Sequence, residues 1–195
     1  METITATAAL DLLSRHRLPR LDANARACHL LNWWGIDHDD LEFATLSPDL
    51  QQQILTQPEP PEDVLDPRYD ELLLIALRAQ YRGVSHLYLM RCLHEAGLGD
   101  YSVDPQIELL EVCPCCGFQT LSARGQYEIC DLCHWEDDGS DTPNALSGPN
   151  HKSLDQAREQ FARTMSDLPL DKWPRAAPIT GRPKTGDPQD GSPTT

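Results

Sequence analysis

Two short motifs, Cys113-Pro114-Cys115-Cys116-Gly117 and Cys130-Asp131-Leu132-Cys133, decide how the middle of this 195-residue chain folds. They hold five of its seven cysteines. As two Cys-x-x-Cys pairs they supply the four thiolates that a tetrahedral structural zinc ion requires: Cys113, Cys116, Cys130 and Cys133. Two intervening residues allow a tight turn that aims both sulfurs of a pair at one ion, and Gly117 suits the unusual backbone angles of that turn. The motifs therefore predict one structural Zn²⁺ ion.

Residues 118–129 connect the two cysteine pairs and predict a strand, a glycine-containing turn and a second strand. Such a hairpin would return the chain to the metal. We therefore expect a zinc-ribbon-like β-hairpin module in this part of the chain.

Other uses of these cysteines compete with metal binding. The chain begins METITATAAL, without the basic and apolar regions of a secretion signal, so we expect a cytoplasmic protein whose thiols stay reduced. Cys115 suits a thiol redox motif, but that use would leave the second cysteine pair unexplained. His134 is an alternative ligand, although its position next to Cys133 would strain the site. Whether Cys115 or His134 replaces one of the four ligands stays open at this point.

An acidic run follows the second pair: Glu136, Asp137, Asp138 and Asp141. These carboxylates suit a divalent cation or acid–base catalysis, but their spacing is not that of a calcium loop. We favour a solvated loop, or carboxylates that accept hydrogen bonds from backbone groups around Gly139 and Ser140. Trp135, just before the run, is predicted to be a hydrophobic lid on the ribbon.

A helix is predicted after the acidic run. Ser153 followed by Gln156 is a capping-box signature. Apolar residues then recur at helical spacing and give the helix one apolar face: Leu154, Ala157, Phe161 and Met165. This helix is expected to fold back on the ribbon and close the module.

Three motifs of this region occur together: Cys-Pro-Cys-Cys-Gly, then Tyr-Glu-Ile-Cys-x-x-Cys-x-Trp-Glu-Asp-Asp-Gly over 127–139, then Gly-Pro-Asn-x-x-Ser-Leu-x-x-Ala-Arg over 148–158. With them, residues 112 to about 161 resemble the cysteine-rich CPCC domain family of bacteria. The resemblance implies a zinc-ribbon-like module and no defined activity. Some members look like antitoxin or immunity partners, so the resemblance also implies a partner of that kind.

The first 110 residues predict a bundle of about five short helices. One ends before Pro19, and the next runs from about Asp22 to Gly35. Others are expected over 48–55, 69–82 and 85–96, with a proline-rich loop over 57–63. Cys28 and Cys92 lie alone in helical patterns and are expected to be buried thiols. The whole chain is therefore predicted to be α+β, with an acidic helical domain (1–110), a CPCC zinc-ribbon-like module (111–172) and a disordered tail (173–195).

A possible partner-binding surface lies in the helical domain. Trp33 and Trp34 are adjacent, so one helix face cannot bury both, and one of them is a candidate contact residue. Three acidic residues follow closely and are candidates for the same surface: Asp37, Asp39 and Asp40. Charge supports this hypothesis, because residues 1–110 hold 18 Asp and Glu against 8 Arg and no Lys, a net charge of −10, and the whole chain carries −15.

So acidic a chain repels phosphate, which argues against direct nucleic-acid binding, and favours a basic protein partner. No run of about 18 apolar residues predicts a membrane span. Four cysteine ligands would leave no open metal position for substrate, and no catalytic motif occurs, so we expect no enzymatic activity.

The prediction is a zinc-binding interaction protein, specifically an immunity or antitoxin protein that neutralises a basic toxin. One alternative is a regulatory or adaptor zinc ribbon that binds ribosome or polymerase components, and a second is a thiol redox protein using Cys115. The oligomeric state stays open.

Overall fold

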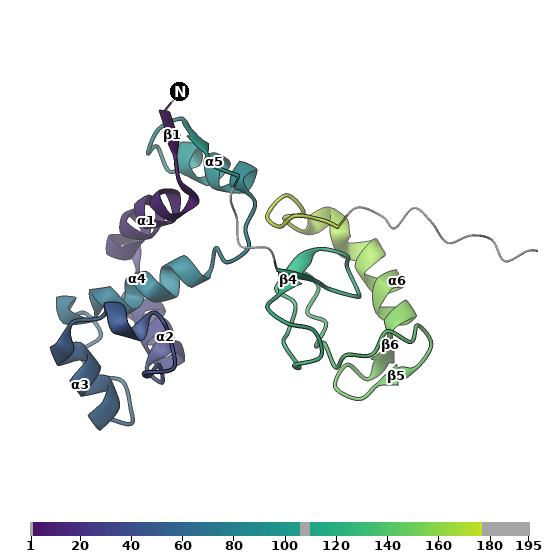
Figure 1. Cartoon of the computed structure of the whole chain (residues 1–195), viewed down its shortest axis with the longest axis horizontal. Helices are drawn as coiled ribbons and strands as arrows, with labels where there is room; N and C mark the ends of the chain where they lie inside the picture. Colours follow the sequence, from purple (N-terminus) through teal and green to yellow (C-terminus); the bar gives the residue numbers. More distant parts are fainter. Residues whose placement is uncertain (1, 106–109, 177–195) are drawn as a thin grey trace, which may run out of the picture.

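The fold is α+β, as the sequence predicts. The computed structural model describes residues 2–105 and 110–176, and Figure 1 shows helices α1 to α5 gathered in one part of the molecule and the short strands β4 to β6 with helix α6 in another. Among these described residues, every helix is too short or too polar to cross a bilayer.

Five α-helices form the first part: α1 (Ala6–Arg17), α2 (Ala23–Trp33), α3 (Pro48–Thr56), α4 (Asp70–Ala79) and α5 (His86–Glu95). Side-chain caps fix where three of them begin, because an oxygen of Thr5, Asp22 or Ser85 accepts a hydrogen bond from a backbone N–H in the first turn. Short 3₁₀ turns lie between the helices: η1 (Leu18–Arg20), η2 (Phe43–Thr45) and η3 (Pro67–Tyr69). The predicted helices and the predicted loop over 57–63 are confirmed.

Strand β1 (Glu2–Ile4) pairs in parallel with β2 (Tyr101–Val103). This pairing brings the start and the end of the helical part together.

Two apolar cores fill the helical part. One is built mainly from α2, α3 and α4, with Leu30, Leu72 and Leu73 inside it, and the other from α1, α5 and β2.

The two isolated cysteines differ from expectation. Cys28 on α2 is exposed and Cys92 on α5 is only half-buried. The buried residues of α2 are Arg26 and Leu30, so the buried face of α2 excludes position 28.

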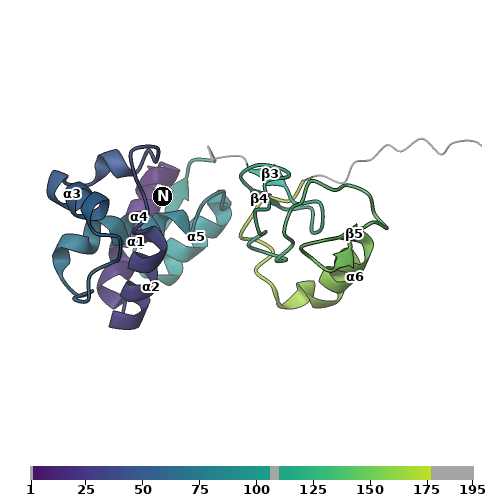
Figure 2. The same cartoon turned by 90° about the horizontal axis from the view of Figure 1, so that it is seen from below.

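The module after residue 110 contains β3 (Glu111–Val112), β4 (Gln119–Leu121), β5 (Leu146–Ser147), β6 (Lys152–Ser153), α6 (Leu154–Thr164) and the 3₁₀ turn η4 (Met165–Asp167). Figure 2 shows β3 and β4 close together beside the helical part. Strand β3 pairs antiparallel with β4, and β5 with β6. The hairpin predicted within 118–129 is therefore wrong in its pairing: β4 pairs with the chain before the first cysteine pair, and Ile129 bridges to Glu136 after the second.

Helix α6 closes the module as predicted. The Ser153 side chain accepts from the Gln156 backbone, and the Gln156 side chain accepts from the Ser153 backbone, which completes the capping box. Leu154, Ala157 and Phe161 are buried in one core with the cysteines and Trp135, which confirms the fold-back and the predicted lid.

The predicted tail begins later than residue 173. Trp173 is buried in the core of the module, Gln119 N donates to Pro174 O at 2.9 Å, and Ala176 N donates to Gly117 O at 3.0 Å. Trp173 adds a large apolar surface to a small core, and this burial explains why residues 173–176 pack on the module. Residues 177–195, the rest of the predicted disordered tail, lie outside the described residues.

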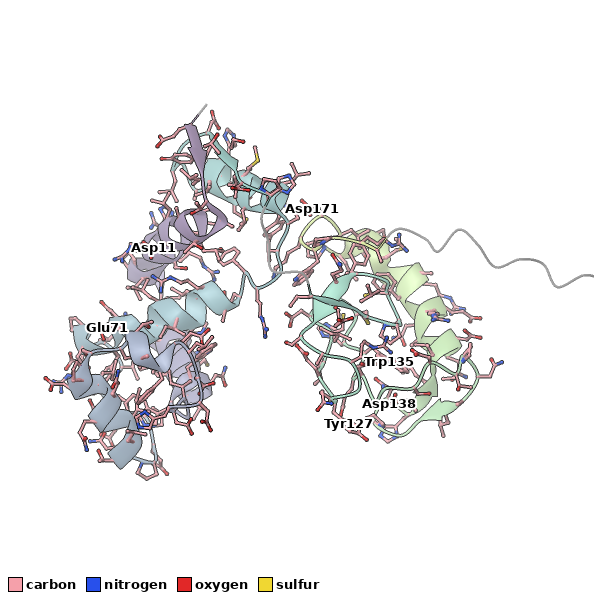
Figure 3. The ribbon with its side chains drawn as sticks, viewed as in Figure 1. Asp11, Glu71, Tyr127, Trp135, Asp138 and Asp171 are labelled. Carbon is pink, nitrogen blue, oxygen red and sulfur yellow. The ribbon has the colours of Figure 1, made fainter. Side chains whose placement is uncertain are left out.

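The two parts meet at the start of α5. Ser85 N donates to Lys172 O at 2.8 Å, and Ser85 Oγ donates to Asp171 O at 2.9 Å. The Asp171 carboxylate pairs with Arg91 at 2.7 Å, and Trp173 Nε1 donates to Arg82 O at 3.3 Å. Figure 3 labels Asp171 at this junction. The segment after α6 therefore fastens the module to the helical part.

Candidate metal centre

Four cysteine sulfurs converge inside the module. The Sγ atoms of Cys113, Cys116, Cys130 and Cys133 all lie within 4.8 Å of one another. Cys113 Sγ is 3.6 Å from Cys133 Sγ, and Cys116 Sγ is 3.7 Å from Cys130 Sγ. A tetrahedron with metal–sulfur bonds of about 2.3 Å has edges of about 3.8 Å, whereas a disulfide needs about 2.05 Å. All seven cysteines are free thiols, so the four sulfurs fit a metal ion.

Each cysteine pair forms the turn of its own small hairpin, with the same hydrogen bonds. In the first turn Cys113 N donates to Phe118 O at 2.9 Å and Gly117 N donates to Cys113 O at 3.0 Å. In the second, Cys130 N donates to Trp135 O and His134 N donates to Cys130 O, both at 2.9 Å. The two turns are equivalent, and each directs two sulfurs to the same point.

The residue after each pair has left-handed backbone angles. Gly117 has φ +78° and His134, at the equivalent position, has φ +59°. His134 is exposed and is absent from the group of residues that can hold a metal. It therefore serves in the turn, as Gly117 does, despite having a side chain that disfavours this conformation.

We expect substitutions at these two positions to change stability in opposite directions. Gly117→Ala should lower the free energy of unfolding of the module by about 1–2 kcal/mol, the usual cost of a left-handed L-residue. The added Cβ would meet only Arg175 Nε, at 3.8 Å, so the cost is conformational rather than steric. His134→Gly should raise that free energy by about 0.5 kcal/mol, since relief of strain exceeds the added chain entropy. Urea unfolding of the metal-loaded chain measures both, and a loss in both variants would contradict the equivalence.

The surroundings of the four sulfurs favour thiolate formation at one of them. Hydrogen bonds from Cys113, Cys116 and Cys133 lower the pKa of Cys130, to which Thr120 Oγ1, 3.0 Å away, also contributes. Hydrogen bonding to Cys113 and to the other neighbouring sulfurs raises the pKa of Cys133. Hydrogen bonding to Cys113 and Cys130 raises the pKa of Cys116, although Cys133 lowers it. A metal ion that takes all four as thiolates displaces the remaining protons.

Helix α6 holds the first turn in place. Arg158 Nε and Nη2 both donate to Pro114 O, at 3.1 and 3.0 Å. Phe161 packs edge-on against Phe118, with ring centroids 6.4 Å apart. Figure 3 shows Trp135 inside the module, between the strands and α6. The sulfurs therefore sit in an apolar core that excludes water from most of the centre.

The acidic run is a hydrogen-bonded loop. Asp138 Oδ1 accepts from Ser140 N at 3.0 Å, and Asp138 Oδ2 accepts from Ser147 Oγ at 2.7 Å. Asp137 is fully buried, and its Oδ2 accepts from Arg124 Nε at 2.8 Å and from Gly125 N at 2.6 Å. Over residues 2–105 and 110–176, the four cysteines are the group that can hold a metal, and the acidic run adds no second one.

Several residues that support the centre were missed by sequence reasoning. Arg124 reaches both Asp137 and Asp141, and Asn150 Nδ2 donates to Glu136 O at 2.8 Å while its Oδ1 accepts from Glu136 N. The Gly-Pro-Asn motif was a signal for Asn150. Arg124 and Thr120 stand in no motif, and only their contacts reveal their roles.

The structure separates the candidate partner-binding residues. Trp34 is buried, and its Nε1 donates to Gln57 O at 2.8 Å, so Trp34 belongs to the core. Asp37, Asp39 and Asp40 form an exposed turn in which Asp39 N donates to Asp37 Oδ1 and Asp37 N donates to Asp40 Oδ2. Trp33 and Asp40 line one groove of about 730 Å³, between the loop after α2 and the end of α4.

The fold and the four sulfurs define a small cysteine-rich domain that can hold a metal ion, joined to a helical bundle. Residues 111–165 match the family described as Cysteine-rich CPCC, which confirms the resemblance seen in the sequence. The match covers this segment alone, and the helical part lies outside it. Neither a curated protein nor a solved structure matches the chain.

Proposed function

We propose that the module binds one structural zinc ion and that the protein acts as a non-enzymatic interaction protein. The convergence of four thiols at tetrahedral spacing carries the first part of the proposal. Four sulfur ligands in a tetrahedron favour zinc or iron, and zinc is the usual ion of a structural site with two cysteine pairs. A closed shell of four protein ligands leaves no position for water or substrate, so the ion stabilises the fold instead of performing chemistry.

The groove on the helical part supports a partner-binding role. Leu41 lies at the edge of this groove, with 89 % of its surface exposed. The side chains of Trp33 and Leu10 form part of its apolar lining. Asp40 and Glu42 line the same groove, and Asp37 and Asp39 stand beside it. Within the described part of the chain, none of these four carboxylates forms a salt bridge.

Unpaired acidic groups around an apolar groove suit a partner with an apolar side chain flanked by Lys or Arg. Arg78, which also lines the groove, is engaged by Asp11, so its charge is already compensated. A basic toxin is the partner we propose first, in line with an immunity or antitoxin role. A ribosome or polymerase component is the alternative, because such proteins are often basic as well.

A photo-crosslinking experiment tests the partner surface. A photoreactive residue placed at position 41 should capture one discrete basic protein in cells of the native organism. The same residue at Leu65, which is 60 % exposed on another loop, serves as the control and should not capture it. Changing Asp37, Asp39 and Asp40 to Lys should abolish the crosslink at 41, and raised salt should weaken binding of the purified pair.

Equal capture at positions 41 and 65, or a partner indifferent to the charge reversal, would contradict the proposed surface. Mass spectrometry of the captured protein separates the two partner classes. A toxin encoded beside this protein supports immunity, and a ribosomal or polymerase subunit supports the adaptor role.

A further inference from the structure

A cavity lies in the module, apart from the groove on the helical part. It has a volume of about 260 Å³, and its walls come from the second cysteine turn, strand β6 and helix α6. Neither the convergence of the four sulfurs nor the partner surface proposed for the groove accounts for this cavity.

The cavity has an apolar floor and a polar rim. Leu132, Trp135 and Phe161 form its floor, and each has at most 7 % of its surface exposed. The exposed residues of its lining are polar: His134, Gln160 and Thr164. A ligand that fits such a cavity has an apolar body and one polar group.

The charge on the cavity wall is positive. Lys152 lines the cavity, and among the described residues no Asp or Glu does, although the whole chain carries −15. Lys152 Nζ donates to Gln160 Oε1 at 2.8 Å and has no carboxylate partner in the described part of the chain. An ammonium group has three protons, so two remain for a ligand. A carboxylate suits them best, because hydrogen bonds between two charged groups are the strong ones.

The metal centre decides how such a carboxylate can lie. A zinc ion with four thiolates has a formal charge of −2, and one of the four sulfurs, that of Cys133, belongs to the cavity wall. Lys152 offsets part of that charge, as does Arg158, which donates to Pro114 O on the first cysteine turn. A carboxylate is therefore favoured where it contacts Lys152 directly, with the apolar body of the ligand toward the floor.

The volume limits the ligand to about one ring with a short side chain. An engineered cavity of about 150 Å³ binds benzene, whereas pockets for drug-sized molecules begin near 300 Å³. The volume of this cavity, about 260 Å³, lies between these two. Trp135 and Phe161 on the floor favour an aromatic body, because aromatic rings pack well edge-on or offset against one another.

We propose that this cavity binds a small aromatic carboxylate. The ring of the ligand packs on Leu132, Trp135 and Phe161, and its carboxylate accepts from Lys152. This site goes beyond the interaction role proposed above and does not depend on which partner occupies the groove.

The test uses the full, metal-loaded chain and three probes that share one ring and one chain length: 3-phenylpropionate, 3-phenylpropan-1-ol and 3-phenylpropylamine. Two-dimensional NMR follows the indole N–H of Trp135 and the backbone amides of 132–135 and 157–168 during each titration. We expect the carboxylate to shift these signals with an affinity about tenfold above that of the alcohol, as for one hydrogen bond to a charged group. The amine should leave them in place, and so should all three probes for the indole of Trp33, in the groove on the helical part.

Two matched substitutions test the role of Lys152. Lys152→Met keeps an apolar stem and removes the charge, so the affinity for 3-phenylpropionate should fall about tenfold, to that of the alcohol. Arg163 lines an adjoining depression but not the cavity, so Arg163→Met should change that affinity by less than about twofold. Metal content is measured for both variants and after each titration, and it should stay at its starting value.

Equal affinity for the three probes would overturn the proposal, as would signals that stay in place even with the carboxylate in the tens of millimolar. Equal losses in Lys152→Met and Arg163→Met would show general attraction to a charged surface, which also overturns it. Loss of metal during the titration would mean that the carboxylate competes with the cysteines for the ion instead of filling the cavity. The metal content of the starting protein tests the proposed zinc site separately.

Discussion

Replacing Cys130 by serine is expected to abolish metal binding and to unfold the module. Cys130 is fully buried, its sulfur lies 3.7 Å from Cys116 Sγ and 3.0 Å from Thr120 Oγ1, and it accepts from Cys133 N at 3.5 Å. In small zinc domains the apparent binding free energy is about 10–16 kcal/mol, and it is also the folding free energy. Removing one of four ligands from so small a core therefore removes the fold.

Metal analysis and two-dimensional NMR of the variant measure this effect. We expect no bound metal, collapsed amide dispersion for residues 111–176, and native-like signals for the helical part, whose two cores contain only residues before position 110. The control is Cys28→Ser, which removes an exposed thiol from α2 and should leave one metal ion per chain. A Cys130→Ser protein with full metal content and dispersed module signals would contradict the metal centre.

The second large effect is expected at the buried carboxylate of the acidic run. Asp137 is fully buried and pairs with Arg124, and breaking such a pair by removing one partner typically costs about 3–5 kcal/mol. Asp137→Asn should fall at the lower end, near 3 kcal/mol, because Arg124 keeps its second partner, Asp141. The loop over 122–126 would then lose the two hydrogen bonds that Asp137 Oδ2 accepts from Arg124 Nε and Gly125 N.

Asp141→Asn is the matched control, because it removes the other partner of the same arginine. The Asp141 side chain is 75 % exposed, so its loss should change the free energy of unfolding by less than about 1 kcal/mol. Urea unfolding of both metal-loaded variants gives the two values. Equal losses would show that burial of Asp137 contributes nothing beyond a surface ion pair.

The cysteine spacing and the helix-capping residues made much of the fold predictable. The four candidate ligands lie together because two Cys-x-x-Cys turns need only local geometry to direct their sulfurs. Helix α6 follows from Ser153, Gln156 and an apolar face, all within one short segment. Local patterns of this kind survive in the folded protein because no tertiary contact opposes them.

The parts that could not be predicted depend on contacts distant in sequence. The predicted hairpin over 118–129 is wrong because β4 pairs with β3, across the first cysteine turn. Alternation of apolar and polar residues does not specify which strand is the partner. Trp173 looked like the start of a tail, yet it fills the core of the module. The adjacency of Trp33 and Trp34 predicts that only one of them is buried. Which one is buried depends on a distant contact, because Trp34 Nε1 donates to the backbone carbonyl of Gln57.

The parallel pairing of β1 with β2 sets an order of events during synthesis. Residues 2–4 can pair only after residues 101–103 have been made, and the two segments are separated by nearly the whole helical part. Pairings between segments so distant in sequence form slowly compared with helices. All partners of that pairing have been translated before Cys113, the first cysteine of the module, is added. Because domains tend to fold as units with the N-terminal one first, the helical part can close before the module that follows it.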